Sequence, residues 1–184
     1  RDRLEAENAY LQEEILTERA HDEIIGTSSA IKQLLAQINL VAPTEANVMI
    51  TGESGTGKAL VASAIHKASD RRRRPLIRFN CGAASAETIA SDLFGHVRGG
   101  APNAMRDKAG ILELAHSGTL YLEEVTELPL DIQGRLLGAL QERAVQRLGE
   151  ERQRSLDIRV IASSSRQLDR EIAAGRMRED FYFH

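Results

Sequence analysis

The stretch that decides the fold reads Val48-Met49-Ile50-Thr51-Gly52-Glu53-Ser54-Gly55-Thr56-Gly57-Lys58. Its first four residues form a short apolar run that ends at glycine, which is typical of a buried β-strand. The glycines allow the backbone to curl so that successive N–H groups point at phosphate oxygens. Residues 59–69 have helical composition, and the N-terminus of a helix carries a partial positive charge that favours an anion. Strand, glycines, lysine and helix together predict a phosphate-binding loop, or P-loop.

The residues expected to hold a nucleotide are Gly52, Glu53, Ser54, Gly55, Thr56, Gly57, Lys58 and Ala59. Backbone N–H groups would supply most of the contacts, and Lys58 would bring a point charge to the β- and γ-phosphates. The position after the lysine normally holds Ser or Thr, whose hydroxyl binds Mg²⁺. Ala59 can coordinate nothing, so we expect the phosphate cradle to lack one of its metal ligands.

A second apolar run, over residues 119–122, ends in the adjacent acids Glu123 and Glu124. Adjacent carboxylates at a strand end are often only a solvated edge. Because this pair follows a P-loop in the same chain, a catalytic interpretation is favoured. Glu123 would then hold Mg²⁺ through water, and Glu124 would polarise the attacking water as general base. The first acid of such a pair is usually Asp, so the longer Glu123 would displace the metal position.

The rest of the chain alternates between predicted strands and helices. Near-continuous apolar runs predict strands over residues 48–51, 76–80, 119–122 and 158–163. Helical patterns cover residues 24–38, 59–69 and 130–142. Such alternation predicts an α/β fold, a three-layer αβα P-loop NTPase with a mostly parallel five-stranded sheet covered on both faces. A ligand would bind across the carboxyl ends of the strands.

Composition narrows the class of protein. A length of 184 residues suits one domain, and a net charge of −3 gives no general attraction to nucleic acid or to anionic membranes. The single cysteine, Cys81, permits no internal disulfide, which favours a reducing cytoplasm. No apolar stretch approaches the ~20 residues that a transmembrane helix needs. We expect no membrane partner.

Two segments stand apart from this pattern. Leu4, Asn8, Leu11 and Ile15 follow the a/d spacing of a coiled coil. Residues 1–20 are therefore predicted to form a linker helix, alone or paired in a short coiled coil, ahead of a nucleotide-binding domain over residues 21–184. The arginine run 71–74 precedes a predicted strand. It is interpreted as a solvated turn, with a phosphate or an acidic partner as the alternative.

Over roughly residues 23–184 the chain resembles the AAA+ domain of sigma-54-dependent activators, also called bacterial enhancer-binding proteins. The resemblance is carried by several motifs in order, beginning with the opening Glu23–Gly26 and the P-loop. It continues through Phe79–Cys81, Asp92–His96, Gly118–Leu122, Leu128–Arg143 and Arg178–Tyr182.

This resemblance implies a ring-forming homo-oligomer, a hexamer or heptamer, that couples ATP hydrolysis to remodelling of RNA polymerase holoenzyme. It implies that Asn80 pairs with the catalytic Glu124 and restrains it, and that Arg178 reaches into a neighbour's site. A helical lid, absent from this sequence, and a C-terminal helix-turn-helix that binds DNA would follow in the complete protein.

Five positions or segments depart from the family pattern. Members of this family usually have Glu after the P-loop lysine, so Ala59 departs both from the general pattern and from the family's own. Glu123 replaces Asp. The family's Gly-Ala-Phe-Thr-Gly-Ala loop, which contacts the sigma factor, aligns with Gly99–Ala104, where both Phe and Thr are missing. Ser165 stands at a sensor position that is usually Asn, and His184 at the second arginine-finger position. Losing a charge-stabilising group typically slows a reaction ~10²–10³-fold.

Three functions are weighed for this combination of motifs. The first is a degenerate transcription regulator that binds ATP, with Mg²⁺ as the expected metal, as an assembly switch. The alternative is an active ATPase that remodels sigma-54 holoenzyme. An unrelated P-loop role is the third possibility. The missing Phe and Thr favour the first, because sigma-54 contact would be impaired.

Overall fold

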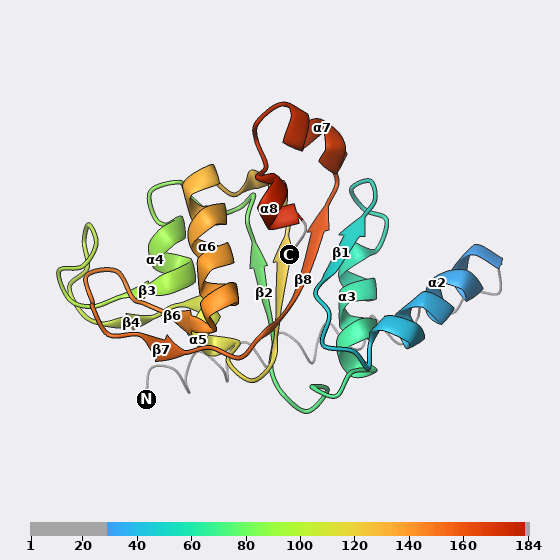
Figure 1. Ribbon diagram of the computed structural model, residues 1–184, viewed down its shortest axis with the longest axis horizontal. Coiled ribbons are helices and arrows are strands. Elements are labelled where there is room, and N and C mark those ends of the chain that lie inside the picture. The colour runs from blue at the N-terminus through green and yellow to red at the C-terminus, as the bar shows by residue number, and fades with distance from the viewer. Residues whose placement is uncertain (1–28, 183–184) are drawn as a thin grey trace.

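The computed structural model describes residues 29–182 of the chain. Its centre is a parallel sheet in the order β1-β8-β5-β2 (Figure 1). The strands are β1 (Val48–Thr51), β8 (Arg159–Ser164), β5 (Thr119–Glu123) and β2 (Leu76–Asn80). All four predicted strands are confirmed to within one residue at each end. The predicted linker helix or coiled coil over residues 1–20 lies outside the described residues.

The sheet differs from prediction in its number of strands. Residues 29–182 contribute four strands to it, not the five expected. The remaining extended segments of this part of the chain form two separate antiparallel pairs, because each is only two residues long and lies in a hairpin. These pairs are β3 (Gly95–His96) with β4 (Lys108–Ala109), and β6 (Ala144–Val145) with β7 (Arg154–Ser155).

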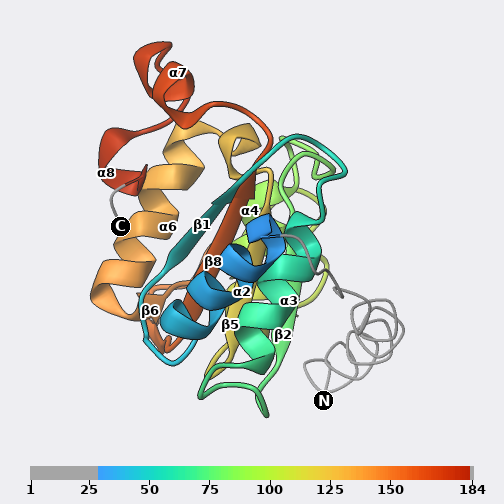
Figure 2. The same ribbon diagram turned by 90° about the vertical axis from the view of Figure 1, so that its right-hand side faces the viewer.

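Helices cover both faces of the sheet, as the apolar strands require. Figure 2 shows α2 (Ser29–Val41) and α3 (Lys58–Lys67) on one face, with α6 (Leu130–Glu142) on the other. Alternate strand residues point to opposite faces, so Tyr121 packs in the core beneath α2 and α3 while Leu122 packs in the core beneath α6. The architecture is the predicted three-layer αβα sandwich.

Short elements complete the described chain. They are α4 (Ile89–Phe94), α5 (Ile111–Leu114), the 3₁₀ turn η1 (Val125–Glu127), α7 (Leu168–Ala173) and α8 (Glu179–Tyr182). Within residues 29–182, no helix combines the length and the apolar character that crossing a membrane requires.

A buried arginine joins β8 to the end of α2. Arg159 is only 1% exposed, and its guanidinium donates hydrogen bonds to the carbonyl oxygens of Val41 (2.9 Å), Ala42 (2.7 Å) and Ala46 (3.0 Å). The last carbonyls of a helix have no partner within the helix, so this side chain supplies the missing donors. Burial lowers the pKa of Arg159 from its ordinary value.

We expect Arg159→Met to reduce the free energy of unfolding by about 2–4 kcal/mol, because buried carbonyl oxygens would lose their donors. Urea denaturation followed by circular dichroism measures the change. Arg73→Met is the control, since Arg73 is exposed and its replacement should have little effect. Equal stability of the two variants would contradict the role assigned to Arg159.

The arginine run is less solvated than predicted. Arg71 has a side chain only 12% exposed and forms ion pairs with Glu45 (2.7 Å) and Asp157 (2.8 Å). It also donates to the carbonyl oxygen of Gly118 (3.0 Å). The prediction of a solvated turn is therefore wrong for Arg71, which joins three distant segments, and is confirmed for the exposed arginines that follow it.

This cluster predicts a pH dependence. The hydrogen bond from Arg71 holds the pKa of Asp157 below its ordinary value. A depressed folded-state pKa contributes stability above the unfolded pKa, and that contribution is lost as the pH falls through the folded value. We expect Asp157→Asn to lose less stability than the wild type below about pH 4, in thermal melts across an acid series. Glu151→Gln, at an exposed position, is the control and should lose stability at acid pH as the wild type does.

Candidate nucleotide-binding site

The P-loop connects β1 to α3 and has the backbone that phosphate binding needs. Gly55 and Gly57 have φ angles of +82° and +87°, which side chains other than glycine rarely adopt. The Nζ of Lys58 donates to the carbonyl oxygens of Gly52 (2.7 Å) and Glu53 (2.8 Å). These bonds fold the lysine back over the loop, which places its charge beside the N-terminus of α3.

The parallel register brings the predicted site residues to one edge of the sheet. Asn80 lies opposite Glu123, and Thr51 lies opposite Ser164. The N–H of Gly52 donates to the carbonyl of Ser164 (3.2 Å), so the P-loop begins beside the end of β8. An open cleft of about 550 Å³ lies here, lined by Thr51, Gly52, Glu53, Ser165, Arg166, Gln167, Leu168, Asp169 and Tyr182.

Glu124 is held by the residue at the predicted sensor position. It adopts a left-handed backbone (φ 54°, ψ 55°) directly after β5. Its Oε2 accepts hydrogen bonds from the Ser165 backbone N–H (3.2 Å) and hydroxyl (2.8 Å). The Oδ1 of Asn80, the predicted partner of Glu124, accepts instead from the N–H of Gly82 (3.0 Å). The short serine thus reaches the carboxylate expected to act as base.

Glu123 has a partner that the sequence analysis missed. Its carboxylate, 19% exposed, forms an ion pair with the guanidinium of Arg78 on β2. That guanidinium also lies over the Tyr121 ring, 5.8 Å from the centroid. A charged residue inside the otherwise apolar run 76–79 was the available signal, because Arg78 shares a strand face with Asn80 two residues later.

Arg178 lies outside the cleft of its own chain. Its backbone N–H donates to the Oε1 of the fully buried Gln133 (2.9 Å), which fixes the segment against α6. Its guanidinium makes two hydrogen bonds to Asp180 (2.9 and 2.7 Å) and is 44% exposed. This exposed position is compatible with a contact to another subunit. The second predicted finger position, His184, lies outside the described residues.

Comparison with known proteins identifies the family. The family model for the Sigma-54 interaction domain matches residues 24–184. The chain belongs to this family. It is 44% identical over 160 residues to the regulatory protein LuxO of Vibrio cholerae serotype O1, and 50% identical over 150 residues to the Sigma54-dependent transcriptional regulator SfnR of Pseudomonas fluorescens.

The relatives are longer than this chain. The matches cover 87% and 82% of the chain but only 30% of LuxO and 41% of SfnR. Among solved structures, NtrX from Brucella abortus in complex with ATP has a TM-score of 0.79 and 38% identity over 98% of this chain and 42% of NtrX. The fold is therefore that of the AAA+ domain of sigma-54-dependent activators, as the resemblance implied.

This Sigma-54 interaction domain does not offer the usual ligands for Mg²⁺. P-loop enzymes hold the ion through a Ser or Thr hydroxyl and a strand-end acid. Ala59 has no oxygen in its side chain, and its methyl group packs against the core beneath α2 and α3. The strand-end acid, Glu123, is paired with Arg78. The side chains at these two positions therefore do not fit a Mg²⁺ site, because one has no oxygen and the other is engaged in an ion pair.

The loop that lacks the family's Phe and Thr is anchored through backbone contacts, although several of its residues are exposed. The N–H of Gly99 donates to the carbonyl of Ala104 (2.9 Å), and the N–H of Val97 donates to that of Leu148 (3.1 Å) in the β6–β7 hairpin. A Cβ atom at Gly100 would overlap the carbonyl oxygen of Leu148. Glycine at position 100 therefore permits the two loops to touch backbone to backbone.

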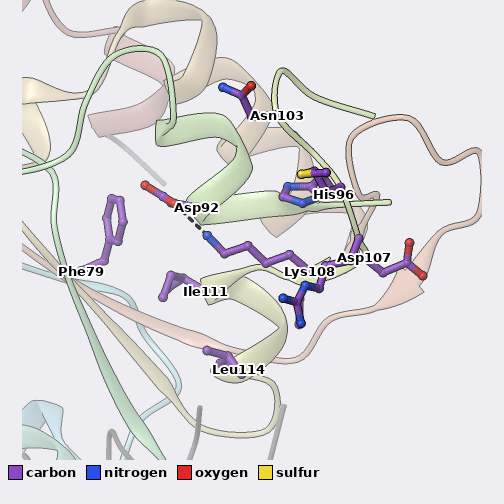
Figure 3. Close-up of a pocket in the computed structure, with 11 residues that line it drawn as sticks. Phe79, Asp92, His96, Asn103, Asp107, Lys108, Ile111 and Leu114 are labelled. Carbon is purple, nitrogen blue, oxygen red and sulfur yellow. Dashed lines mark hydrogen bonds and ion pairs between the residues drawn. The ribbon is translucent and has the colours of Figure 1, made fainter. Parts of the chain in front are cut away.

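A cavity of about 590 Å³ borders the same loop, apart from the nucleotide cleft (Figure 3). Phe79 on β2 and Leu114 on α5 form apolar parts of its wall, and Asn103 lies on the loop side. An ion pair between Lys108 on β4 and Asp92 on α4 (3.1 Å) links the β3–β4 pair to α4. The loop over residues 99–104 is thus flanked by elements that backbone hydrogen bonds and an ion pair hold in place.

We expect Gly100→Ala to separate the two loops and to reduce the free energy of unfolding by about 1–3 kcal/mol through overpacking. Hydrogen exchange should show faster exchange of the Val97 and Gly99 amides. Gly138→Ala on α6 is the control, because a Cβ there meets nothing within 4 Å and alanine favours a helix. Unchanged protection in Gly100→Ala would show that the contact is not required.

Proposed function

We propose that this chain is the ATP-binding domain of a bacterial transcription regulator, and that it uses ATP as an assembly switch with hydrolysis weakened or lost. One observation carries the proposal. The P-loop has the backbone and the lysine that phosphate binding needs. The positions that would bind Mg²⁺ for hydrolysis are instead substituted or paired with another side chain. Lys58 stands over a loop of the right backbone shape, while Ala59 and the Arg78–Glu123 pair occupy the metal-binding positions.

ATP binding rests on Gly52 to Ala59, where most contacts come from the backbone and survive changes of side chain. NtrX from Brucella abortus, 37–38% identical to this chain, has been solved with ADP and with ATP. A similar backbone here supports the same class of ligand. Residues beyond this chain would complete the adenine contacts in a helical lid.

Besides the metal-binding positions, weakened hydrolysis rests on two substitutions, Ser165 and His184. The catalytic groups that are retained are Glu124, Asn80 and Arg178. Glu124 is the proposed base, and Ser165 already holds its carboxylate through two hydrogen bonds. Asn80 is the proposed restraint on that base. Arg178 would supply charge from a neighbouring subunit, but His184 replaces the second arginine and lacks its permanent charge. Removing such stabilising groups typically costs ~10²–10³-fold in rate.

The proposed partners follow from the family. Copies of the chain would form a ring, a hexamer or heptamer, in the bacterial cytoplasm. RNA polymerase holoenzyme would be the target, with sigma-54 contact impaired because Gly99–Ala104 lacks Phe and Thr. DNA would be bound through a C-terminal domain beyond this sequence.

The alternative function is an active ATPase that remodels sigma-54 holoenzyme. Lys58, Glu124 and Arg178 all remain in place, and this retention favours the alternative. It also requires that Glu123 and Ser165 work in place of the usual Asp and Asn.

The decisive measurement compares assembly with turnover in the full-length protein. We expect ATP to shift the oligomeric state in analytical ultracentrifugation while phosphate release stays at the level of Lys58→Ala, which should also fail to assemble. Glu124→Gln should assemble as the wild type does, because assembly would depend on ATP binding and not on a reaction that needs this carboxylate. Phosphate release that exceeds Lys58→Ala and disappears in Glu124→Gln would favour the active ATPase.

A further inference from the structure

We propose that the Arg78 guanidinium takes the place of the divalent cation at this site, so that the chain binds ATP without Mg²⁺. This inference rests on the proposed function, because it concerns the same nucleotide site. It assigns a specificity to that site, namely for the metal-free nucleoside triphosphate, and assigns a role in nucleotide binding to a β2 residue.

The first argument is the chemistry of position 59. In P-loop NTPases a Ser or Thr hydroxyl after the lysine is one of the groups that hold Mg²⁺. Ala59 directs only a methyl group into the core that contains Tyr121, Ala62 and Ile65. The P-loop side of the site therefore contributes one cation, Lys58, and no side-chain ligand from position 59.

The second argument is the charge on Glu123. A strand-end carboxylate attracts a divalent ion when its negative charge is unopposed. Here the side chain is 19% exposed and paired with the guanidinium of Arg78, so the charges cancel locally. A Mg²⁺ ion at this carboxylate would lie beside a fixed positive charge, and like charges at a few ångströms repel strongly in a partly buried site. Metal binding would first require the ion pair to break.

The third argument is that Arg78 is held in position yet accessible. Its Cα lies opposite that of Tyr121 in the β2–β5 register, and its guanidinium lies over that ring. Tyr121 is itself fixed, since it is 2% exposed and its hydroxyl donates to the Oγ of Ser163 (3.0 Å). The Arg78 side chain nevertheless remains 40% exposed. Packing sets where the guanidinium lies, and exposure leaves it open to a ligand.

The fourth argument is the donor capacity of arginine. A guanidinium carries five N–H donors, and a carboxylate engages at most two of them in a bidentate pair. The remaining donors suit phosphate oxygens, which arginine binds with a fixed planar geometry. Arg78 is level with Tyr121, which packs beneath α3, and it shares a strand face with Asn80 at the end of β2. Arg78 and Lys58 together supply two positive charges for the phosphates.

The test measures the affinity of the full-length protein for a fluorescent ATP analogue, once with excess Mg²⁺ and once with excess EDTA. We expect the wild-type dissociation constants to agree within about twofold. Arg78→Ala should bind at least about tenfold more weakly in EDTA, a change of about 1.4 kcal/mol. Arg73→Ala, at an exposed position in the preceding turn, is the matched control and should bind as the wild type does.

A second variant tests whether ATP binding can be made dependent on Mg²⁺. Ala59→Ser combined with Arg78→Ala and Glu123→Asp restores an unopposed acid and a hydroxyl, so its binding should become Mg²⁺-dependent by about tenfold or more. Circular dichroism establishes that each variant is folded.

The possible outcomes separate the two proposals. Wild-type binding that weakens tenfold or more in EDTA overturns this inference but leaves ATP binding intact. Equal binding by Arg78→Ala and the wild type in EDTA overturns the role of Arg78. If folded wild-type protein binds no nucleotide under either condition, the proposed function fails, and this inference fails with it.

Discussion

The parallel register of the central sheet is the constraint on which the site depends. Because all four strands run in the same direction, their carboxyl ends meet at one edge, and the segments that follow them are brought together there. The pairing of Asn80 with Glu123 and of Thr51 with Ser164 sets this alignment. A shift by one residue would turn every side chain to the opposite face, so the core and the nucleotide edge are determined together.

Charge at that edge is balanced by side chains of the chain itself. Glu123 is paired with Arg78, and Glu124 accepts two hydrogen bonds from Ser165. Lys58 rests on loop carbonyls. Two adjacent carboxylates at a sheet edge repel each other, and each here has a donor that stabilises it. Two of the departures from the family pattern therefore have partners at this edge, since Glu123 pairs with Arg78 and Ser165 contacts the proposed base.

Close packing and ion pairs hold the loop over residues 99–104 and the β6–β7 hairpin. Gly100 permits its loop to touch Leu148 in the β6–β7 hairpin. The same hairpin is tied to α5 by Arg147, which makes two hydrogen bonds to the nearly buried Glu113 (2.9 and 3.0 Å). The loop over Gly99–Ala104, which lacks the family's Phe and Thr, is thus attached to a framework of backbone contacts and ion pairs.

Local pattern in the sequence determined the P-loop, the positions of four strands, the helix over residues 130–142 and the acid pair. Each of these features depends on residues a few positions apart. A strand that is buried on both faces of the sheet appears in the sequence as a nearly continuous apolar run. Only the tertiary structure decided that Arg78 pairs with Glu123, that Ser165 holds Glu124 and that Arg71 is nearly buried. The Arg78–Glu123 and Ser165–Glu124 contacts join residues more than 40 positions apart, and the register of the parallel strands rather than local sequence brings them within bonding distance.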